Sequence, residues 1–217
     1  MDKGNYNIET GATRDELFNH LKNETRVLQN AGLEDAFDRV DRADFVAGDY
    51  ISEAYEDYPL PIAGGSTISQ PTTVAFMLEL LEIQEGERVL DVGSGSGWTT
   101  ALIASLVGEE GSVLGIEIQP ELVEFGRRNI QKYPYINAVI EDAHTALLRE
   151  ESFNKILVSA ELQDVPEEFI RALADEGMLL APLDGSLVLF RKRGDELVEE
   201  KRVEGFAFVP YVHTKDK

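Results

Sequence analysis

Cysteine is absent from this 217-residue sequence, and histidine is scarce. Without cysteine the chain can form no disulfide, no thiol nucleophile and no cysteine-based zinc site. The three histidines, His20, His144 and His213, lie far apart in the sequence and form no cluster with the spacing of metal ligands. We therefore expect no metal site.

Basic residues are too few to balance the acidic ones. The chain has 20 Lys and Arg against 41 Asp and Glu, which gives a formal net charge of −21. A field this negative repels phosphate backbones and anionic lipid surfaces unless a local basic patch offsets it. The densest basic cluster, residues 191–193, is followed almost at once by acidic residues. We expect neither nucleic acid nor membrane as a partner.

Long apolar runs are also missing. None approaches the ~20 residues that a membrane-spanning helix needs. The polar residues 1–10 lack the apolar segment of a signal peptide. The sequence therefore predicts a cytoplasmic protein, which we expect to be a monomer, and its 43% hydrophobic content supplies material for a sizeable core.

The main feature that is present is an alternation of strands and helices. Buried strands are expected over residues 88–92, 113–117, 138–141 and 155–159. Four helices are expected. The first covers residues 72–82, the second follows strand 88–92 and its turn and ends at residue 107, the third begins at Pro120 and the fourth begins at Pro166. Such alternation from residue 72 to about 175 predicts an α/β fold with a doubly wound, mostly parallel sheet covered by helices on both faces.

Both ends of the chain add to this core. The spacing from Thr13 to Glu16 predicts a capping box, followed by a helix that Gly32 ends and a second short helix over 33–40. Asp184-Gly185 predicts a hairpin between strands 178–183 and 186–191, and hence an antiparallel C-terminal edge.

We expect one domain over residues 1–217. Its parts are a helical N-terminal attachment with a substrate-side loop over 1–71, a cofactor-binding α/β core over 72–195 and a C-terminal strand region over 196–217. Residues 41–71 form a long irregular segment, and such segments in compact domains are either linkers or functional loops. The aromatic and apolar residues in this one argue against a linker.

A glycine-rich segment, residues 91–98 with the sequence DVGSGSGW, joins the first core strand to its helix. Glycines let the backbone turn sharply and approach a ligand closely, and a helix N-terminus offers unpaired N–H groups. A dinucleotide fingerprint needs its third glycine at position 98, where Trp98 stands, and a P-loop needs Gly-Lys-Ser/Thr. The pattern Asp-x-Gly-x-Gly-x-Gly instead resembles the first motif of class I S-adenosylmethionine-dependent methyltransferases.

Two carboxylates follow the next strands. Glu117 ends the second core strand, where a carboxylate can accept both ribose hydroxyls of an adenosine cofactor. The alternative is a solvated acidic residue, and the context favours the ligand role. Asp142, after the third strand, could then bind the adenine amino group, although alone it is no better than an even choice.

Residues 55–62 (YEDYPLPI) and 65–71 (GSTISQP) resemble the segment before the cofactor loop of protein-L-isoaspartate O-methyltransferases. Those enzymes typically carry Gly-Gln-Thr-Ile-Ser-Gln-Pro there. Residues 89–98 are similar to their Val-Leu-Glu-Ile-Gly-Thr-Gly-Ser-Gly-Tyr. The resemblance covers roughly residues 14–212.

The resemblance implies a Rossmann-like methyltransferase that transfers a methyl group from S-adenosyl-L-methionine to the free carboxyl of an L-isoaspartyl residue in a damaged protein, leaving S-adenosyl-L-homocysteine. The active-site residue that it implies is Ser69. The substrate side that it implies comprises Thr67, Ile68, Gln70, Ser159 and Glu161. The cofactor residues that it implies are Asp91, Gly93, Ser94, Gly95, Gly97, Glu117, Ile118, Asp142 and Ala143.

The residue inventory suits this chemistry. A carboxylate acceptor has a pKa near ~4, is ionised at pH 7 and needs no general base. Catalysis should then come from positioning and from donors that orient the acceptor. Ser69 is therefore interpreted as an orienting donor and not a covalent nucleophile; the alternative is a loop serine that caps the following helix.

Three departures from the family pattern fall on the substrate side. Glu161 and Gln163 stand where the family has small residues, residues 63–65 are Ala-Gly-Gly where it often has His or Tyr, and residues 182–186 are a tighter loop. Glu161 would repel an acceptor carboxylate if it pointed into the pocket and would be harmless if it pointed to solvent; both orientations stay open.

These departures leave two alternative functions. One is a carboxyl methyltransferase with a different dedicated peptide or protein acceptor. The other is a non-catalytic S-adenosylmethionine-binding module, which the retained stretch 67–69 disfavours because a binder has no need to orient an acceptor.

The charge leads to a first prediction. The acidic excess is either a solubility feature of exposed faces or an adaptation to a salty cell interior, where screening shortens the repulsion to a few ångströms. If salt is the reason, the melting temperature will rise from dilute buffer to molar salt. A melting temperature that stays flat in this thermal scan leaves only the solubility explanation.

Overall fold

The computed structural model describes residues 11–134, 136–146 and 152–212. The polar residues 1–10, whose composition argued against a signal peptide, lie outside the described residues, as does the end of the C-terminal region from residue 213. In the described part of the chain, no helix is both long enough and apolar enough to span a bilayer.

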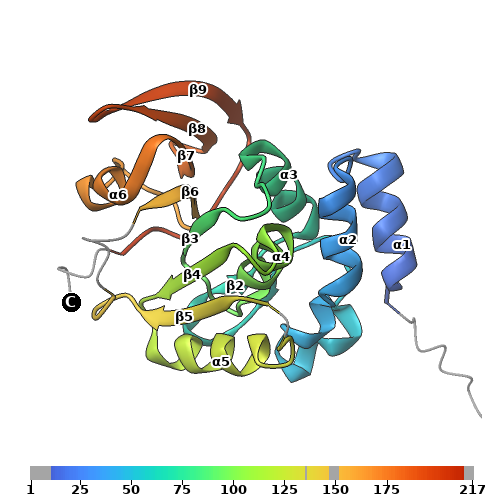
Figure 1. Cartoon of the computed structure of the whole chain (residues 1–217). Helices are drawn as coiled ribbons and strands as arrows, with labels where there is room; N and C mark the ends of the chain where they lie inside the picture. The colour runs from blue at the N-terminus through green and yellow to red at the C-terminus, as the bar shows by residue number, and fades with distance from the viewer. Residues whose placement is uncertain (1–10, 135, 147–151, 213–217) are drawn as a thin grey trace, which may run out of the picture.

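The centre of the molecule is a seven-stranded sheet (Figure 1). In spatial order its strands are β5 (Ala138–Asp142), β4 (Ser112–Glu117), β3 (Arg88–Val92), β6 (Phe153–Val158), β7 (Leu173–Leu183), β8 (Ser186–Arg193) and β9 (Glu196–Glu204). Neighbouring strands from β5 to β7 pair in parallel, and β8 and β9 pair antiparallel. The predicted mostly parallel sheet with an antiparallel C-terminal edge is confirmed.

Helices and short turns surround the sheet. The helices are α1 (Arg14–Asn19), the π-helical turn η1 (His20–Glu24), α2 (Ala31–Arg39), α3 (Pro71–Leu81), α4 (Trp98–Val107), α5 (Pro120–Ile130) and α6 (Glu167–Ala172). Between α2 and α3 the chain forms the 3₁₀ turns η2 (Arg42–Asp44), η3 (Gly48–Glu53) and η4 (Ala63–Gly65) and a small antiparallel hairpin, β1 (Leu60–Pro61) with β2 (Thr67–Ile68). This part corresponds to the irregular segment expected over residues 41–71.

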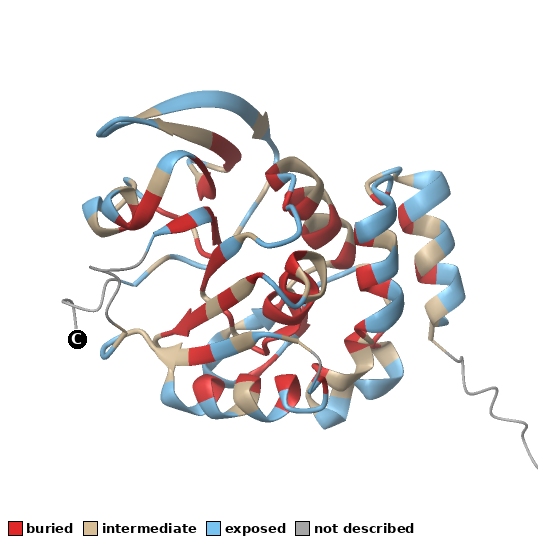
Figure 2. Ribbon diagram, viewed as in Figure 1, coloured by how far each residue is buried: buried red, intermediate tan, exposed pale blue. Residues whose placement is uncertain are grey.

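The sheet separates two apolar cores, and successive residues of its central strands belong to one core and then the other. Val89 and Leu157 belong to the larger core, which contains buried side chains of α2, α3, α4 and α5. Leu90 and Ile156 belong to the smaller core, together with buried side chains of α6. Because both faces are covered, the central strands are buried along most of their length (Figure 2). Helices on both faces are as predicted.

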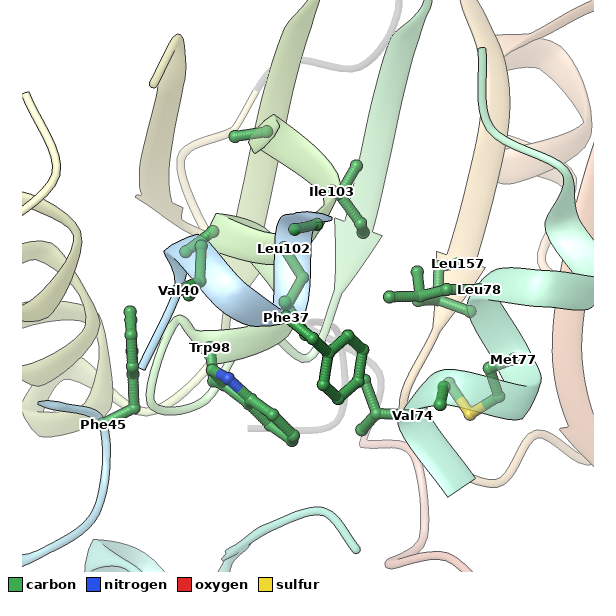
Figure 3. Close-up of a cluster of buried hydrophobic side chains, with 14 of the residues drawn as sticks. Phe37, Val40, Phe45, Val74, Met77, Leu78, Trp98, Leu102, Ile103 and Leu157 are labelled. Atoms are coloured by element: carbon green, nitrogen blue, oxygen red, sulfur yellow. The ribbon is translucent and has the colours of Figure 1, made fainter. Parts of the chain in front are cut away.

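The tryptophan that follows the glycine-rich loop is a core residue. Trp98 is 2% exposed and meets the ring of Phe37 edge to face, with centroids 5.7 Å apart (Figure 3). It thereby joins the N-terminal helices to the helix that begins directly after the loop. A side chain this large at position 98 has a packing role that a third glycine could not fill.

The predicted local signals at several element ends are present. Thr13 and Glu16 form the reciprocal capping box of α1. Pro120 is the first residue of α5, where its missing N–H costs nothing. Asp184 and Gly185 both have positive φ, 49° and 70°, as a two-residue hairpin turn requires.

The first helix is shorter than predicted, and Gly32 does not end it. α1 passes at His20 into the π-helical turn, which closes where the Thr25 amide donates to the His20 carbonyl at 3.0 Å. A new helix begins at Ala31, because the Asn30 side chain accepts from the amide of Gly32 at 2.8 Å. The residue that matters here is therefore Asn30, which caps the start of α2, and not Gly32 as the end of the preceding helix.

The strand β7 begins at Leu173 and not at residue 178, so the preceding helix does not reach residue 175. Glu176 lies in the left-handed region, with φ 59°. The pairing of β7 with β6 shifts register between Phe153 and Lys155. This irregularity interrupts the apolar alternation, which is why the sequence pattern missed the start of the strand.

One carboxyl group is buried in the centre of the sheet. Asp91 is 0% exposed; its Oδ2 accepts from the Thr100 hydroxyl at 2.6 Å, and its Oδ1 has no partner among the described residues. Burial raises the pKa of Asp91 from 3.8 to about 6, the nearby charge of Glu117 adds to this, and the Thr100 hydrogen bond opposes it. The folded state therefore keeps a proton on Asp91 at pH values where the unfolded chain has lost it.

This proton makes stability depend on pH. Because the folded pKa lies above the unfolded one, the contribution of Asp91 is most favourable below pH ~4, declines as pH rises to ~6 and is constant above that. We predict that Asp91→Asn removes this dependence. The free energy of unfolding of the variant relative to the parent should rise by about 2 kcal/mol between pH 4 and 7, measured by urea denaturation. The exposed Asp35→Asn is the control for loss of one charge; a variant-minus-parent difference that is flat across pH for Asp91→Asn would contradict the prediction.

Candidate active site

A cavity lies at the carboxyl ends of the parallel strands. The strand order reverses between β3 and β6, and ligands of open α/β sheets bind outside the strand ends at such a point. The cavity has a volume of about 310 Å³, within the range of about 300–1,000 Å³ typical of small-molecule sites. Its described lining is Gly64, Gly65, Ser66, Thr67, Ser69, Val92, Gly93, Gly95, Ile116, Glu117, Ile118, Gln119, Ala143, Ser159, Ala160, Val209, Pro210, Tyr211 and Val212.

The glycine-rich loop forms one side of this cavity. Gly93, Gly95 and Gly97 have φ values of 81°, 51° and 84°, a region that other residues rarely adopt. Gly93 and Gly95 line the cavity. Gly97 lies outside the lining, where an added Cβ would stand 3.1 Å from side-chain atoms of Ile130 and Ile140. The first two glycines thus present main chain to the cavity, and the third lets the loop pack onto the fold.

Glu117 places a buried carboxylate in the cavity wall. It is 6% exposed. Its Oε2 accepts from the Gly95 amide at 3.0 Å, and its Oε1 accepts from the amides of Ile118 and Gln119 at 2.8 and 3.0 Å. A carboxylate has about four acceptor positions, so Glu117 can accept a further donor while it holds the loop. Among the described lining residues it is the only charged one.

The other expected cofactor residues are distributed unevenly. Ile118 and Ala143 line the cavity. Asp142 lies outside the described lining, and its Oδ1 accepts from the His144 amide at 2.8 Å. Asp91 and Ser94 are buried and also lie outside the lining. The structure therefore brings together the two lining glycines, Glu117, Ile118 and Ala143, and leaves the remainder behind or beside the wall.

Another part of the cavity wall comes from the chain that precedes α3. Thr67 and Ser69 line the cavity, whereas Ile68 is buried at 3% exposure in the larger core. Gln70 turns away from the cavity and donates from Nε2 to the Asp57 carbonyl at 2.9 Å.

The start of α3 is held by Asp57. The carboxylate of Asp57 accepts from the amide and hydroxyl of Thr72 at 2.8 and 2.7 Å. Burial raises the pKa of Asp57, but the hydrogen bonds from Thr72 and Gln70 outweigh this and lower it below its usual value. With this role filled by Asp57, the hydroxyl of Ser69 is left for the cavity.

A buried guanidinium organises this side of the cavity. Arg42 is 3% exposed, and it donates from Nη1 to the carbonyls of Ala54 and Glu56 (2.8 and 3.1 Å) and from Nη2 to those of Tyr58 and Ser69 (3.0 and 3.1 Å). Its guanidinium carbon lies 5.4 Å from the centre of the Trp98 ring. Burial lowers the pKa of Arg42 to about 10, so it stays charged at pH 7. Arg42 therefore joins the main chain of Ser69 to Trp98, the first residue of α4.

After β6 the chain lines the cavity for two residues and then leaves it. Ser159 and Ala160 are in the wall, and Glu161 is not. The Glu161 carboxylate points neither into the cavity nor freely into solvent, because its Oε1 accepts from the amide of Gly185 at 2.9 Å. Gln163 is exposed.

Several site features were missed by sequence reasoning. Gln119 donates from Nε2 to the Ser66 hydroxyl at 2.9 Å, across the cavity rim. Gly64 has a φ of 65°, which other residues rarely adopt, and a Cβ there would lie 1.5 Å from Gln119 Oε1 and displace this amide. The C-terminal residues 209–212 close another wall. The Ala-Gly-Gly sequence at residues 63–65 could have indicated the contact between Gln119 and Ser66. No feature of the nearby sequence indicated that residues 209–212 form a wall of the cavity.

Within the described ranges, no group of three or more His, Asp or Glu side chains is arranged to hold a metal ion. The described lining combines main-chain amides, small and apolar residues, one carboxylate and hydroxyls. Such a set suits an adenosine-containing ligand and an acceptor that needs orientation.

The fold and this site define the Rossmann-like class of methyltransferases. A solved protein-L-isoaspartate O-methyltransferase superimposes with a TM-score of 0.83 and 26% identity, over 93% of this chain and 67% of that one. A crystal structure described as a β-aspartate methyltransferase (PCMT) from Plasmodium falciparum, in complex with S-adenosyl-L-homocysteine, matches with a TM-score of 0.79 and 26% identity, over 92% and 98% of the two chains.

Sequence comparison is more specific. The family model of protein-L-isoaspartate(D-aspartate) O-methyltransferase (PCMT) matches residues 12–216. Relatives named protein-L-isoaspartate O-methyltransferase include those of Thermococcus onnurineus, 40% identical over 86% of this chain and 87% of the relative, and Methanopyrus kandleri, 37% identical over 92% and 91%. This chain belongs to the protein-L-isoaspartate(D-aspartate) O-methyltransferase family, which confirms the predicted resemblance.

The contacts of Arg42 generate a second prediction. Arg42→Met keeps an apolar stem of similar length but leaves four carbonyls without their charged donor. Because hydrogen bonds to charged groups are worth about 1.5–3 kcal/mol each, we expect the free energy of unfolding to fall by about 3 kcal/mol or more, measured by urea denaturation.

The control is Arg171→Met, on the exposed α6 pair with Glu167. It should change stability by less than about 1 kcal/mol. Equal effects of the two substitutions would contradict the role given to Arg42.

Proposed function

We propose that this protein transfers the methyl group of S-adenosyl-L-methionine to the free carboxylate of L-isoaspartyl residues in damaged proteins. The observation that carries the proposal is the cavity itself, whose lining brings together Glu117, the glycine-rich loop, Ser69 and Thr67. Membership of the family supports the same reaction.

The residues present fit the cofactor. Glu117 retains acceptor capacity for ribose hydroxyls, and the main chain of Gly93 and Gly95 borders the cavity without side chains that would fill it. Ile118 and Ala143 supply apolar wall on the same side. When bound, S-adenosyl-L-methionine supplies an activated methyl group on a sulfonium sulfur. Asp142, whose carboxylate already accepts from the His144 amide, would contact the adenine end.

The acceptor end of the cavity suits a carboxylate. Apart from Glu117, the described lining residues are uncharged, although the chain carries a net charge of −21. An acceptor carboxylate therefore meets no opposing carboxylate in the wall near Ser69. It is ionised at pH 7 and needs no proton removed before it attacks.

The chain's own task is then to orient the acceptor. The Ser69 carbonyl accepts from Arg42, which fixes the main chain that carries the Ser69 side chain at the cavity. A hydroxyl donor that fixes one carboxylate oxygen leaves the other free to attack in line. Thr67 and Ser159 border the same space. We infer in addition that the protein acts as a cytoplasmic monomer without nucleic acid or membrane partners.

The experiment is a methylation assay with labelled cofactor and a pair of peptides that differ only in an isoaspartyl or an aspartyl residue. We expect labelling of the isoaspartyl peptide alone, as a base-labile methyl ester. Equal labelling of both peptides, or of neither, would contradict the proposed function.

Ser69→Ala tests the orienting role in the same assay. Loss of one positioned donor should lower kcat/KM by about tenfold to a hundredfold and leave the affinity for S-adenosyl-L-homocysteine, measured by calorimetry, unchanged. The control is Ser105→Ala on α4, which lies outside the described cavity lining. A variant at position 69 with parental kcat/KM would rule the role out.

A further inference from the structure

The C-terminal wall of the cavity is attached to the chain that follows β6. The Glu161 amide donates to the Val209 carbonyl at 2.8 Å, and the Tyr211 amide donates to the Glu161 carbonyl at 2.8 Å. Val209 and Tyr211 both line the cavity. The main chain of Glu161 therefore fixes the wall at two points on either side of Pro210.

The beginning of the same C-terminal segment is attached elsewhere. The amides of Gly205 and Phe206 both donate to the carbonyl of Gly185, each at 3.0 Å. Gly185 is the second residue of the tight turn between β7 and β8. The Phe206 ring also stacks on Phe76 of α3, with centroids 5.6 Å apart. The segment is thus attached to the β7–β8 turn at its start and to Glu161, in the chain after β6, at its end.

The side chain of Glu161 closes this arrangement. Its Oε1 accepts from the Gly185 amide at 2.9 Å, so the residue that holds the end of the segment also holds the turn that anchors its beginning. We use the term C-terminal brace for Glu161, the Gly185 turn and residues 205–211. The neighbouring Leu162 amide donates to the Pro182 carbonyl at 2.9 Å and holds the chain after β6 against the end of β7.

We propose that Glu161 is a positioning residue of the acceptor site, which acts through the C-terminal brace to hold the wall formed by Val209 and Tyr211. The inference rests on the proposed function, because it assigns that wall to the acceptor. The carboxylate acts as a hydrogen-bond acceptor for a main-chain amide, so its negative charge is not what the site uses. The segment follows the exposed edge strand β9, so its position depends on these attachments, and small displacements of a positioned wall have large effects on rate.

A pair of variants separates this role from an electrostatic one. Glu161→Gln removes the charge but keeps an oxygen that can accept from the Gly185 amide, whereas Glu161→Ala removes both. Glu167→Ala on α6, where the exposed Glu167 pairs with Arg171, removes the same charge outside the brace. If Glu161 repelled the acceptor, Gln and Ala would both raise kcat/KM to a similar extent.

The proposal predicts a different order. For the isoaspartyl peptide, Glu161→Ala should raise KM by about tenfold with a smaller change in kcat, while Glu161→Gln and Glu167→Ala stay within about twofold of the parent. The affinity for S-adenosyl-L-homocysteine should be unchanged in all three, because the hydrogen bonds of Glu161 go to Val209, Tyr211 and Gly185, none of which is expected to hold the cofactor. A KM for Glu161→Ala equal to the parent value would overturn the proposal, as would parallel increases of kcat/KM in the Gln and Ala variants.

A second measurement does not depend on activity. In hydrogen–deuterium exchange, the amides of Gly205, Phe206 and Tyr211 should exchange faster in Glu161→Ala and at the parental rate in Glu161→Gln. If the parent does not methylate the peptide, the proposed function fails and exchange alone decides on the brace. Unchanged exchange over residues 205–211 in Glu161→Ala would overturn it.

Discussion

The acceptor side of this protein depends on one buried cation. Arg42 donates to the carbonyls of Ala54, Glu56, Tyr58 and Ser69, and these bonds fix the shape of a segment that consists mainly of 3₁₀ turns and the short β1–β2 hairpin. A buried charge is tolerated only when it is well hydrogen-bonded, and here the bonds go to main chain, which substitutions in the segment cannot remove. Through its contact with Trp98, the same guanidinium ties the acceptor segment to the helix behind the glycine-rich loop. Arg42 lies outside the described lining, but it bonds to the main chain of one lining residue, Ser69, and contacts the helix that follows the glycine-rich loop.

The two sides of the cavity are built by different means. The cofactor side is main-chain geometry, in which left-handed glycines bring the loop close and the Glu117 carboxylate holds three amides. The acceptor side is held from behind by polar side chains that point away from the cavity, namely Arg42, Asp57 and Glu161. The acidic excess of the chain is kept out of the lining, so an anionic acceptor gains no long-range attraction but meets no local repulsion near Ser69.

The sequence predicted the mostly parallel sheet, its antiparallel edge and the glycine-rich loop, because these follow from short-range patterns such as apolar runs, glycines and the turn at Asp184-Gly185. It did not predict the end of α1 or the start of β7, where a π-helical turn and a register shift break the periodicity. Arg42 had no signal, since its partners are carbonyls that any sequence carries. The orientation of Glu161 was left open for a similar reason, because its partner Gly185 is remote in sequence and is brought close only by the finished sheet.

The central claim is that the acceptor carboxylate binds at a rigid, pre-built wall beside Ser69. The most direct test is a crystal structure of the protein with S-adenosyl-L-homocysteine and an isoaspartyl peptide. The account predicts the isoaspartyl carboxylate within hydrogen-bonding distance of the Ser69 hydroxyl, with Arg42 still bound to its four carbonyls and Glu161 still bound to Gly185. A peptide carboxylate that lies away from Ser69, or a Glu161 side chain that has turned into the cavity, would contradict it.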